Sequence, residues 1–167
     1  MIDYSVFLKE EGLEDRVNDI RLRVTNKIPE IIVKVGKFGG EENRKELSVL
    51  ASLGDYDKLV QIFAILGLTK GMLCVRKSIA YEYKGIEFAL VEVPNHSFYF
   101  EAEMMISSDA DKNNAKQFIK DTCKQLGLKL FTDETFFAYI SKLNNEANEV
   151  FDYKNYKDGY FQDRFKL

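Results

Sequence analysis

The sequence predicts an α+β fold built around an antiparallel β-sheet. Five short segments alternate charged and apolar residues with a period of two, which is typical of strands that bury one face. Hairpin-sized connections separate several of these segments, and helical stripes do not alternate with them regularly. We therefore expect helices to cover the apolar strand faces, while the charged faces turn toward each other or toward solvent. Closing such a sheet would produce an antiparallel β-barrel with charges inside it.

The first half of the chain predicts a strand-rich region followed by one helix. Residues 1–16 have weak periodicity and are expected to form a short strand or an arm. Asp55 has the side chain of a helix N-cap, and the apolar stripe after it ends at Gly67. The glycines of residues 36–40 fit no phosphate-loop spacing, so we assign them to a turn. The elements expected here are strands over residues 19–25, 30–35 and 44–50 and a helix over residues 55–66.

The second half predicts three more strands, then two helices and a tail. The turns between the strands contain Gly85 and Pro94, and Gly127 closes the first of the two helices. The expected strands cover residues 72–83, 86–93 and 98–106, and the expected helices begin at Asp109 and Thr132. The C-terminal residues are rich in Tyr and Lys without periodicity, which predicts a loose tail or one packed against a partner or the outer helices. We therefore expect one domain over residues 1–150 and a tail over residues 151–167.

Composition argues against several classes of protein. A chain of 167 residues can bury one sizeable core, and a net charge of −3 gives no reason to expect a nucleic-acid binder. No apolar run approaches the ~20 residues of a membrane span, and no signal-peptide pattern is present, so no membrane partner is expected. Cys74 and Cys123 are too few and too far apart for a disulfide framework or a zinc motif. These observations predict a cytoplasmic protein with reduced cysteines.

The charged strand faces predict a site for an anion together with a metal ion. If the strands close, five cations and three carboxylates share one face, which leaves a formal charge of +2. Burying these charges is costly unless a ligand, water or close pairing compensates them. The alternative is a solvated sheet face with cross-strand ion pairs, which would serve as an interaction scaffold. The residues concerned are Arg21, Arg23, Lys34, Arg44 and Arg76, together with Glu46, Glu101 and Glu103.

Five of these charged motifs follow one another in an order typical of a known family. They read Arg21-Leu22-Arg23, Lys34, Arg44-Lys45-Glu46, Arg76 with Tyr81, and Phe100-Glu101-Ala102-Glu103. This order resembles the CYTH superfamily, the triphosphate tunnel metalloenzymes, over about residues 19–106. The resemblance implies an antiparallel β-barrel of the triphosphate tunnel type with helices outside it.

Three departures from the family pattern are present. The family's opening Glu-x-Glu-x-Lys strand is not found in residues 1–8. Val91 stands where the family usually has Asp, and Ser78 stands where it has a second basic residue. We therefore expect the barrel to lack its first strand. A partner subunit could supply that strand by edge addition, which would make the protein a homodimer.

The resemblance implies metal-dependent binding and hydrolysis of a triphosphate-bearing small molecule. The five cations would bind phosphate oxygens through bidentate guanidinium forks and the Lys34 point charge. Glu46, Glu101 and Glu103 would hold Mg²⁺ or Mn²⁺, while Glu101, Glu103 and Lys34 would be catalytic. The departures favour an alternative, a module that binds polyphosphate or a nucleotide without turnover. Class IV adenylate cyclase activity is a further alternative.

Overall fold

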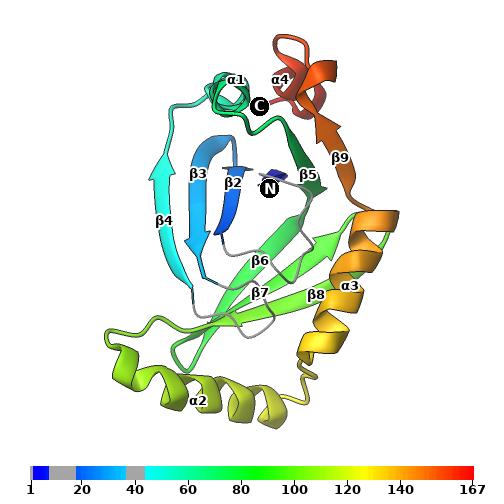
Figure 1. The fold of residues 1–167 in the computed structure, drawn as a ribbon. Helices are drawn as coiled ribbons and strands as arrows, with labels where there is room; N and C mark the ends of the chain where they lie inside the picture. The colour runs from blue at the N-terminus through cyan, green and yellow to red at the C-terminus, as the bar shows by residue number, and fades with distance from the viewer. Residues whose placement is uncertain (1, 8–17, 37–43) are drawn as a thin grey trace. The chain divides into compact units, whose positions relative to one another are not determined.

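The computed structural model describes residues 2–7, 18–36 and 44–167. The chain divides into two compact units, the first formed by residues 1–76 with 133–167 and the second by residues 77–132. The positions of the two units relative to one another are not determined (Figure 1). Both units combine antiparallel strands with helices, so the predicted α+β class is confirmed.

The first unit contains a six-stranded sheet in which every neighbouring pair is antiparallel. Its strand order is β4-β3-β2-β1-β5-β9, so β4 and β9 are its edges. The β2–β3 hairpin turns at Asn26 and Lys27, whose positive φ values of 51° and 71° suit a two-residue turn. The strands are β1 (Ile2–Phe7), β2 (Asn18–Thr25), β3 (Ile28–Val35), β4 (Lys45–Leu50), β5 (Lys70–Val75) and β9 (Glu149–Asp152).

Two helices cover one face of this sheet. Tyr56 on α1 (Tyr56–Ile65) is 1% exposed and donates a hydrogen bond from its hydroxyl to the Leu22 carbonyl at 3.1 Å. Phe161 on α4 (Tyr160–Phe165) is fully buried, and its ring centroid lies 5.1 Å from that of Tyr56 and 5.0 Å from that of Phe151. The C-terminal residues therefore belong to the core of the first unit. The expectation of a loose tail is wrong, and packing against the helices is what occurs.

A buried carboxylate joins α1 to the C-terminal segment. Asp57 is 7% exposed and accepts hydrogen bonds from the Phe161 amide at 3.1 Å, the Gln162 amide at 2.8 Å and the Tyr156 hydroxyl at 3.0 Å. The two amides belong to the first turn of α4, where a negative charge is favourable. Burial, and then the bond to Asp57, raises the pKa of Tyr156 to about 12. Asp57 thus stabilises the C-terminal helix from outside it.

The second unit is a three-stranded antiparallel sheet with one long helix. The strand order is β6-β7-β8, formed by β6 (Lys77–Tyr83), β7 (Ile86–Val93) and β8 (Ser97–Glu103). A short 3-10 helix, η2 (Asp109–Asp111), leads into α2 (Lys112–Gln125). Ile86 and Phe88 on β7 pack with Cys123 on α2, and burial raises the pKa of the Cys123 thiol.

The remaining elements of the first unit follow α2 in sequence. Helix α3 (Asp133–Glu146) buries Leu143, which is 2% exposed, and leads to β9. A short 3-10 helix, η3 (Tyr153–Asn155), then connects β9 to α4. No helix among the described residues is long and apolar enough to cross a membrane.

The predicted closed barrel of the triphosphate tunnel type is wrong. Within the described residues the strands form two open sheets, and the segment expected as one strand over residues 72–83 divides at Arg76 between them. The expectation that the first strand is missing is also wrong, because β1 pairs with both β2 and β5. Period-two alternation shows which face of a strand is buried, but it does not show which strand edges pair. Closure of the sheet into a barrel could therefore not be inferred from the alternation of charged and apolar residues.

Candidate functional site

Charged side chains cluster on the sheet face opposite α1 and α4. The Cα register aligns Asp19 with Lys34 and Lys34 with Glu46, while Arg23 aligns with Glu30. Because residues two apart along a strand share a face, these positions lie on one side of the sheet. We call this surface the charged face. It comprises Asp19, Arg21 and Arg23 on β2, Glu30, Ile32 and Lys34 on β3, Glu46 and Ser48 on β4, and Arg44, which precedes β4.

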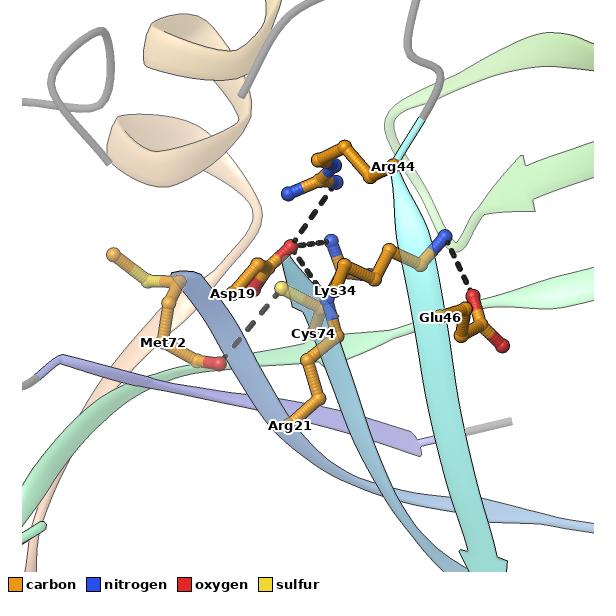
Figure 2. Close-up of polar contacts among 7 residues, drawn as sticks. All are labelled: Asp19, Arg21, Lys34, Arg44, Glu46, Met72 and Cys74. Atoms are coloured by element: carbon orange, nitrogen blue, oxygen red, sulfur yellow. Dashed lines mark hydrogen bonds and ion pairs between the residues drawn. The ribbon is translucent and has the colours of Figure 1, made fainter. Parts of the chain in front are cut away.

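Asp19 lies near the start of β2, in the same row of the charged face as Lys34 and Glu46, and is fully buried. Its Oδ2 accepts hydrogen bonds from Nε of Arg21 at 2.9 Å and from Nη2 of Arg21 at 2.5 Å. The same oxygen lies 3.5 Å from Nη2 of Arg44, whose side chain is only 3% exposed (Figure 2). One carboxylate therefore holds together two guanidinium groups that come from different strand regions. Fixed guanidinium groups lose less conformational entropy when they bind an anion.

A second ion pair lies beside this cluster. Nζ of Lys34 is 3.1 Å from Oε2 of Glu46, with side-chain exposures of 20% and 44% (Figure 2). On the neighbouring row, the Ser48 hydroxyl donates a hydrogen bond to the Glu30 carboxylate. These contacts show that the charged face is an organised network and that its Lys34 end is open to solvent. Such an end is accessible to a small anion.

The charged face carries a small positive excess. Four cations against three carboxylates leave a formal charge of +1, lower than the +2 expected from sequence. The difference arises because Asp19 and Glu30 belong to the charged face, whereas Arg76, Glu101 and Glu103 lie elsewhere. Each guanidinium presents several N–H donors, so Arg21, whose side chain is 19% exposed, can bond Asp19 and also contact a ligand. Ile32, fully buried, forms an apolar floor between the Arg21 and Ser48 positions.

Arg76, the fifth predicted cation, lies directly after β5 and not on the charged face. It is 6% exposed and donates to the Val75 carbonyl at 2.8 Å and to Oδ1 of Asn148 at 2.7 Å. Asn148 in turn donates from Nδ2 to Oδ1 of Asn144 at 2.8 Å. Arg76 therefore links β5 to the segment between α3 and β9. These contacts support a structural role for Arg76 in the first unit.

The predicted metal ligands are divided between the two units. Glu46 lies on the charged face, whereas Glu101 and Glu103 lie on β8 of the second unit, where both are exposed. The Cα of Glu103 is paired with that of Glu87 on β7. Across the described ranges, no group of three or more His, Cys, Asp or Glu side chains could hold a metal ion. The metal site expected from sequence therefore draws on residues of both units and stays a prediction.

Two members of the network were absent from the sequence-based site. Asp19 has the strand parity of Arg21, and Glu30 has the parity of Lys34, so both were visible as candidates. A search of the sequence for anion-binding residues selects cations, so it does not find a carboxylate that organises them. The parity itself is the signal that could have found both residues.

No protein family and no curated protein matches this sequence. Three solved structures from Pyrococcus share its fold. The PH1819 protein of Pyrococcus horikoshii OT3 is 19% identical, covers 84% of this chain and 82% of its own, and superposes with a TM-score of 0.63. The PH1012 protein of the same organism is 19% identical, with coverages of 77% and 73% and a TM-score of 0.58. A conserved hypothetical protein from Pyrococcus furiosus, Pfu-838710-001, is 22% identical, with coverages of 77% and 74% and a TM-score of 0.58.

Proposed function

We propose that the charged face binds the phosphate chain of a triphosphate-bearing small molecule. The observation that carries the proposal is the convergence of Arg21 and Arg44 on Asp19, with Arg23 and Lys34 beside them. Neighbouring strands are about 4.8 Å apart, and residues two apart along a strand are about 6.8 Å apart. Cations at this spacing can each meet a different phosphate of one short chain. The order of the motifs, which resembles the CYTH superfamily, supports the same ligand class.

Hydrolysis of the terminal phosphate, with Mg²⁺ or Mn²⁺, is the reaction that the resemblance implies. Phosphoryl transfer needs mainly positioning and electrostatic stabilisation, which Arg21, Arg23, Lys34 and Arg44 would supply on the phosphate oxygens. Arginine forks would orient the chain, and Lys34 would act as a point charge near its end. Two cysteines that are not joined in a disulfide, Cys74 and Cys123, and a small phosphorylated ligand fit the cytoplasmic location expected from sequence.

Binding without turnover is the second candidate, and specific contacts favour it. Glu46 is paired with Lys34, and Asp19 is bonded by Arg21 and Arg44. Two of the three carboxylates of the charged face, Asp19 and Glu46, are therefore engaged by cations in this structure. A face of this kind can retain a polyphosphate through its cations alone.

Calorimetric titration with tripolyphosphate tests the binding proposal. The variants Arg23→Glu and Lys34→Glu should each weaken binding by about 10- to 100-fold, since a hydrogen bond to a charged group contributes about 1.5–3 kcal/mol. Lys142→Glu is the matched control, because Lys142 is a 57% exposed cation on α3 of the same unit. Equal affinities for the wild type and both charged-face variants would contradict the proposal.

Phosphate release separates the two candidates. Tripolyphosphate, ATP and thiamine triphosphate would each be incubated with the protein, with and without Mg²⁺ or Mn²⁺. Metal-dependent release that Arg23→Glu reduces would establish hydrolysis at the charged face. Binding without release of phosphate from any of the three would establish the binding module.

A further inference from the structure

A group of exposed aliphatic side chains lies on the opposite side of the first unit from the charged face. We call it the apolar patch, and its members are 44–86% exposed. They come from one continuous stretch of sequence that runs from β4 through the connection into α1. The members are Leu47 and Val49 on β4, Leu53 in the connection, Ile62 and Ile65 on α1, and Leu66 directly after it.

The strand members of the patch face the helix side of the sheet. Leu47 and Val49 pair with Val33 and Ile31 on β3, and Ile31 packs against the core that contains α1. They are nevertheless 52% and 66% exposed. Hence the helices cover β2 and the strands toward β9, and the described helices of the first unit leave the β4 edge uncovered.

The helix members extend this uncovered surface. Asp57 and Gln61 lie on the flank of α1 that faces the C-terminal segment, since both bond to Tyr156 there. Leu66 follows Asp57 by two and a half helical turns, which places it on the opposite flank. Phe161 of α4 packs on Phe151 of β9, so α4 lies toward the β9 edge and the opposite flank of α1 faces the β4 edge (Figure 1). Leu66 and Ile62 therefore border the same surface as Leu47 and Val49.

The apolar area of the patch matches that of a dimer interface. A CH₂ group corresponds to roughly 32 Å² of surface, so the six side chains at these exposures present on the order of 500 Å². A standard interface buries about 800 Å² per partner, and homodimer interfaces are about 65% apolar. The required apolar area is thus roughly 520 Å², which the patch supplies almost alone.

We infer that the apolar patch is the interface of a homodimer. The patch combines a ridge, formed by Ile62, Ile65 and Leu66, with a lower floor, formed by Leu47 and Val49. A two-fold axis places the ridge of each copy on the floor of the other, which is the self-complementarity that a closed dimer requires. Since the charged face lies on the other side of the sheet, the proposed interface does not cover it. The inference therefore stands independently of the proposed function.

Light scattering coupled to size-exclusion chromatography, across a concentration series of the full chain, tests the dimer. The wild type should have twice the monomer mass. Ile65→Lys and Val49→Lys should each raise the dimer dissociation constant at least tenfold and yield monomers. Both positions are well exposed, at 86% and 66%, so circular dichroism should show an unchanged fold.

Met105→Lys is the control, because Met105 is a 97% exposed apolar residue of the second unit. It should leave the dimer intact. A monomeric wild type would overturn the inference and would leave the patch to a different occupant, such as an amphipathic helix of another protein. A dimer that persists in both Ile65→Lys and Val49→Lys would also overturn it.

Discussion

Replacing Asp19 with asparagine would remove the charge that organises the charged face. The substitution preserves side-chain shape, but the two bonds from Arg21 and the ion pair with Arg44 lose their anionic partner. Asp19 is fully buried and the Arg44 side chain is 3% exposed, so water cannot readily replace the lost charge. Arg21, at 19% exposure, retains some hydration. The main consequence is an uncompensated positive charge inside the first unit.

The expected loss of stability follows from these contacts. A hydrogen bond between charged groups contributes about 1.5–3 kcal/mol, and removing one partner of a buried pair costs about 3–5 kcal/mol. The partial exposure of Arg21 favours the lower end, so we expect Asp19→Asn to destabilise the fold by about 3 kcal/mol. For a chain of this size that corresponds to a decrease in melting temperature of roughly 6–12 °C.

Far-ultraviolet circular dichroism during thermal and urea unfolding would measure this effect, because the chain contains no tryptophan for fluorescence. Asp158→Asn is the matched control, since Asp158 is exposed and lies in the same unit. An Asp19→Asn variant as stable as Asp158→Asn would refute the role assigned to the buried carboxylate.

Two further predictions concern the C-terminal segment. Asp57→Asn should destabilise the first unit by about 2–3 kcal/mol, because α4 loses a charged acceptor at its start. It should also speed hydrogen exchange at the Phe161 and Gln162 amides, and unchanged exchange there would contradict the prediction. The raised pKa of Tyr156 should stabilise the fold below about pH 10, and this contribution should be lost as the pH rises toward 12, because the unfolded tyrosine ionises first. Between about pH 9 and about pH 11, the urea midpoint should therefore fall less for Tyr156→Phe than for the wild type. Equal decreases would contradict the stabilising role of the Tyr156 hydroxyl.

Local structure was largely predictable from the sequence. The alternating segments became strands, and the stripe after Asp55 became α1, with Gly67 just beyond its end at a φ of 88°. Asp55 itself makes no side-chain cap bond, although it was expected to cap the helix, and instead accepts a hydrogen bond from Lys58. Local propensity and periodicity act within a few residues, and this explains why they were informative here.

Long-range pairing was not predictable in the same way. Residues 72–83 were expected to form one strand, yet the chain passes from one sheet to another at Arg76, where Arg76, Lys77 and Ser78 interrupt the alternation. Nothing in a strand's own pattern specifies its neighbour, so closure into a barrel did not follow from it. The C-terminal aromatic residues had no periodicity, and Phe161 was buried through contacts with Tyr56 and Phe151, which are distant in sequence. Similarly, the grouping of Arg21, Arg23 and Lys34 followed from strand parity, whereas the role of Asp19 required the contacts.

The affinity of the full chain for tripolyphosphate, measured by calorimetry for the wild type and for Arg23→Glu, tests the central claim most directly. We expect saturable binding by the wild type and at least a tenfold loss of affinity in Arg23→Glu, with the affinity of Lys142→Glu unchanged. Wild-type protein that does not bind tripolyphosphate, with or without Mg²⁺, would contradict it.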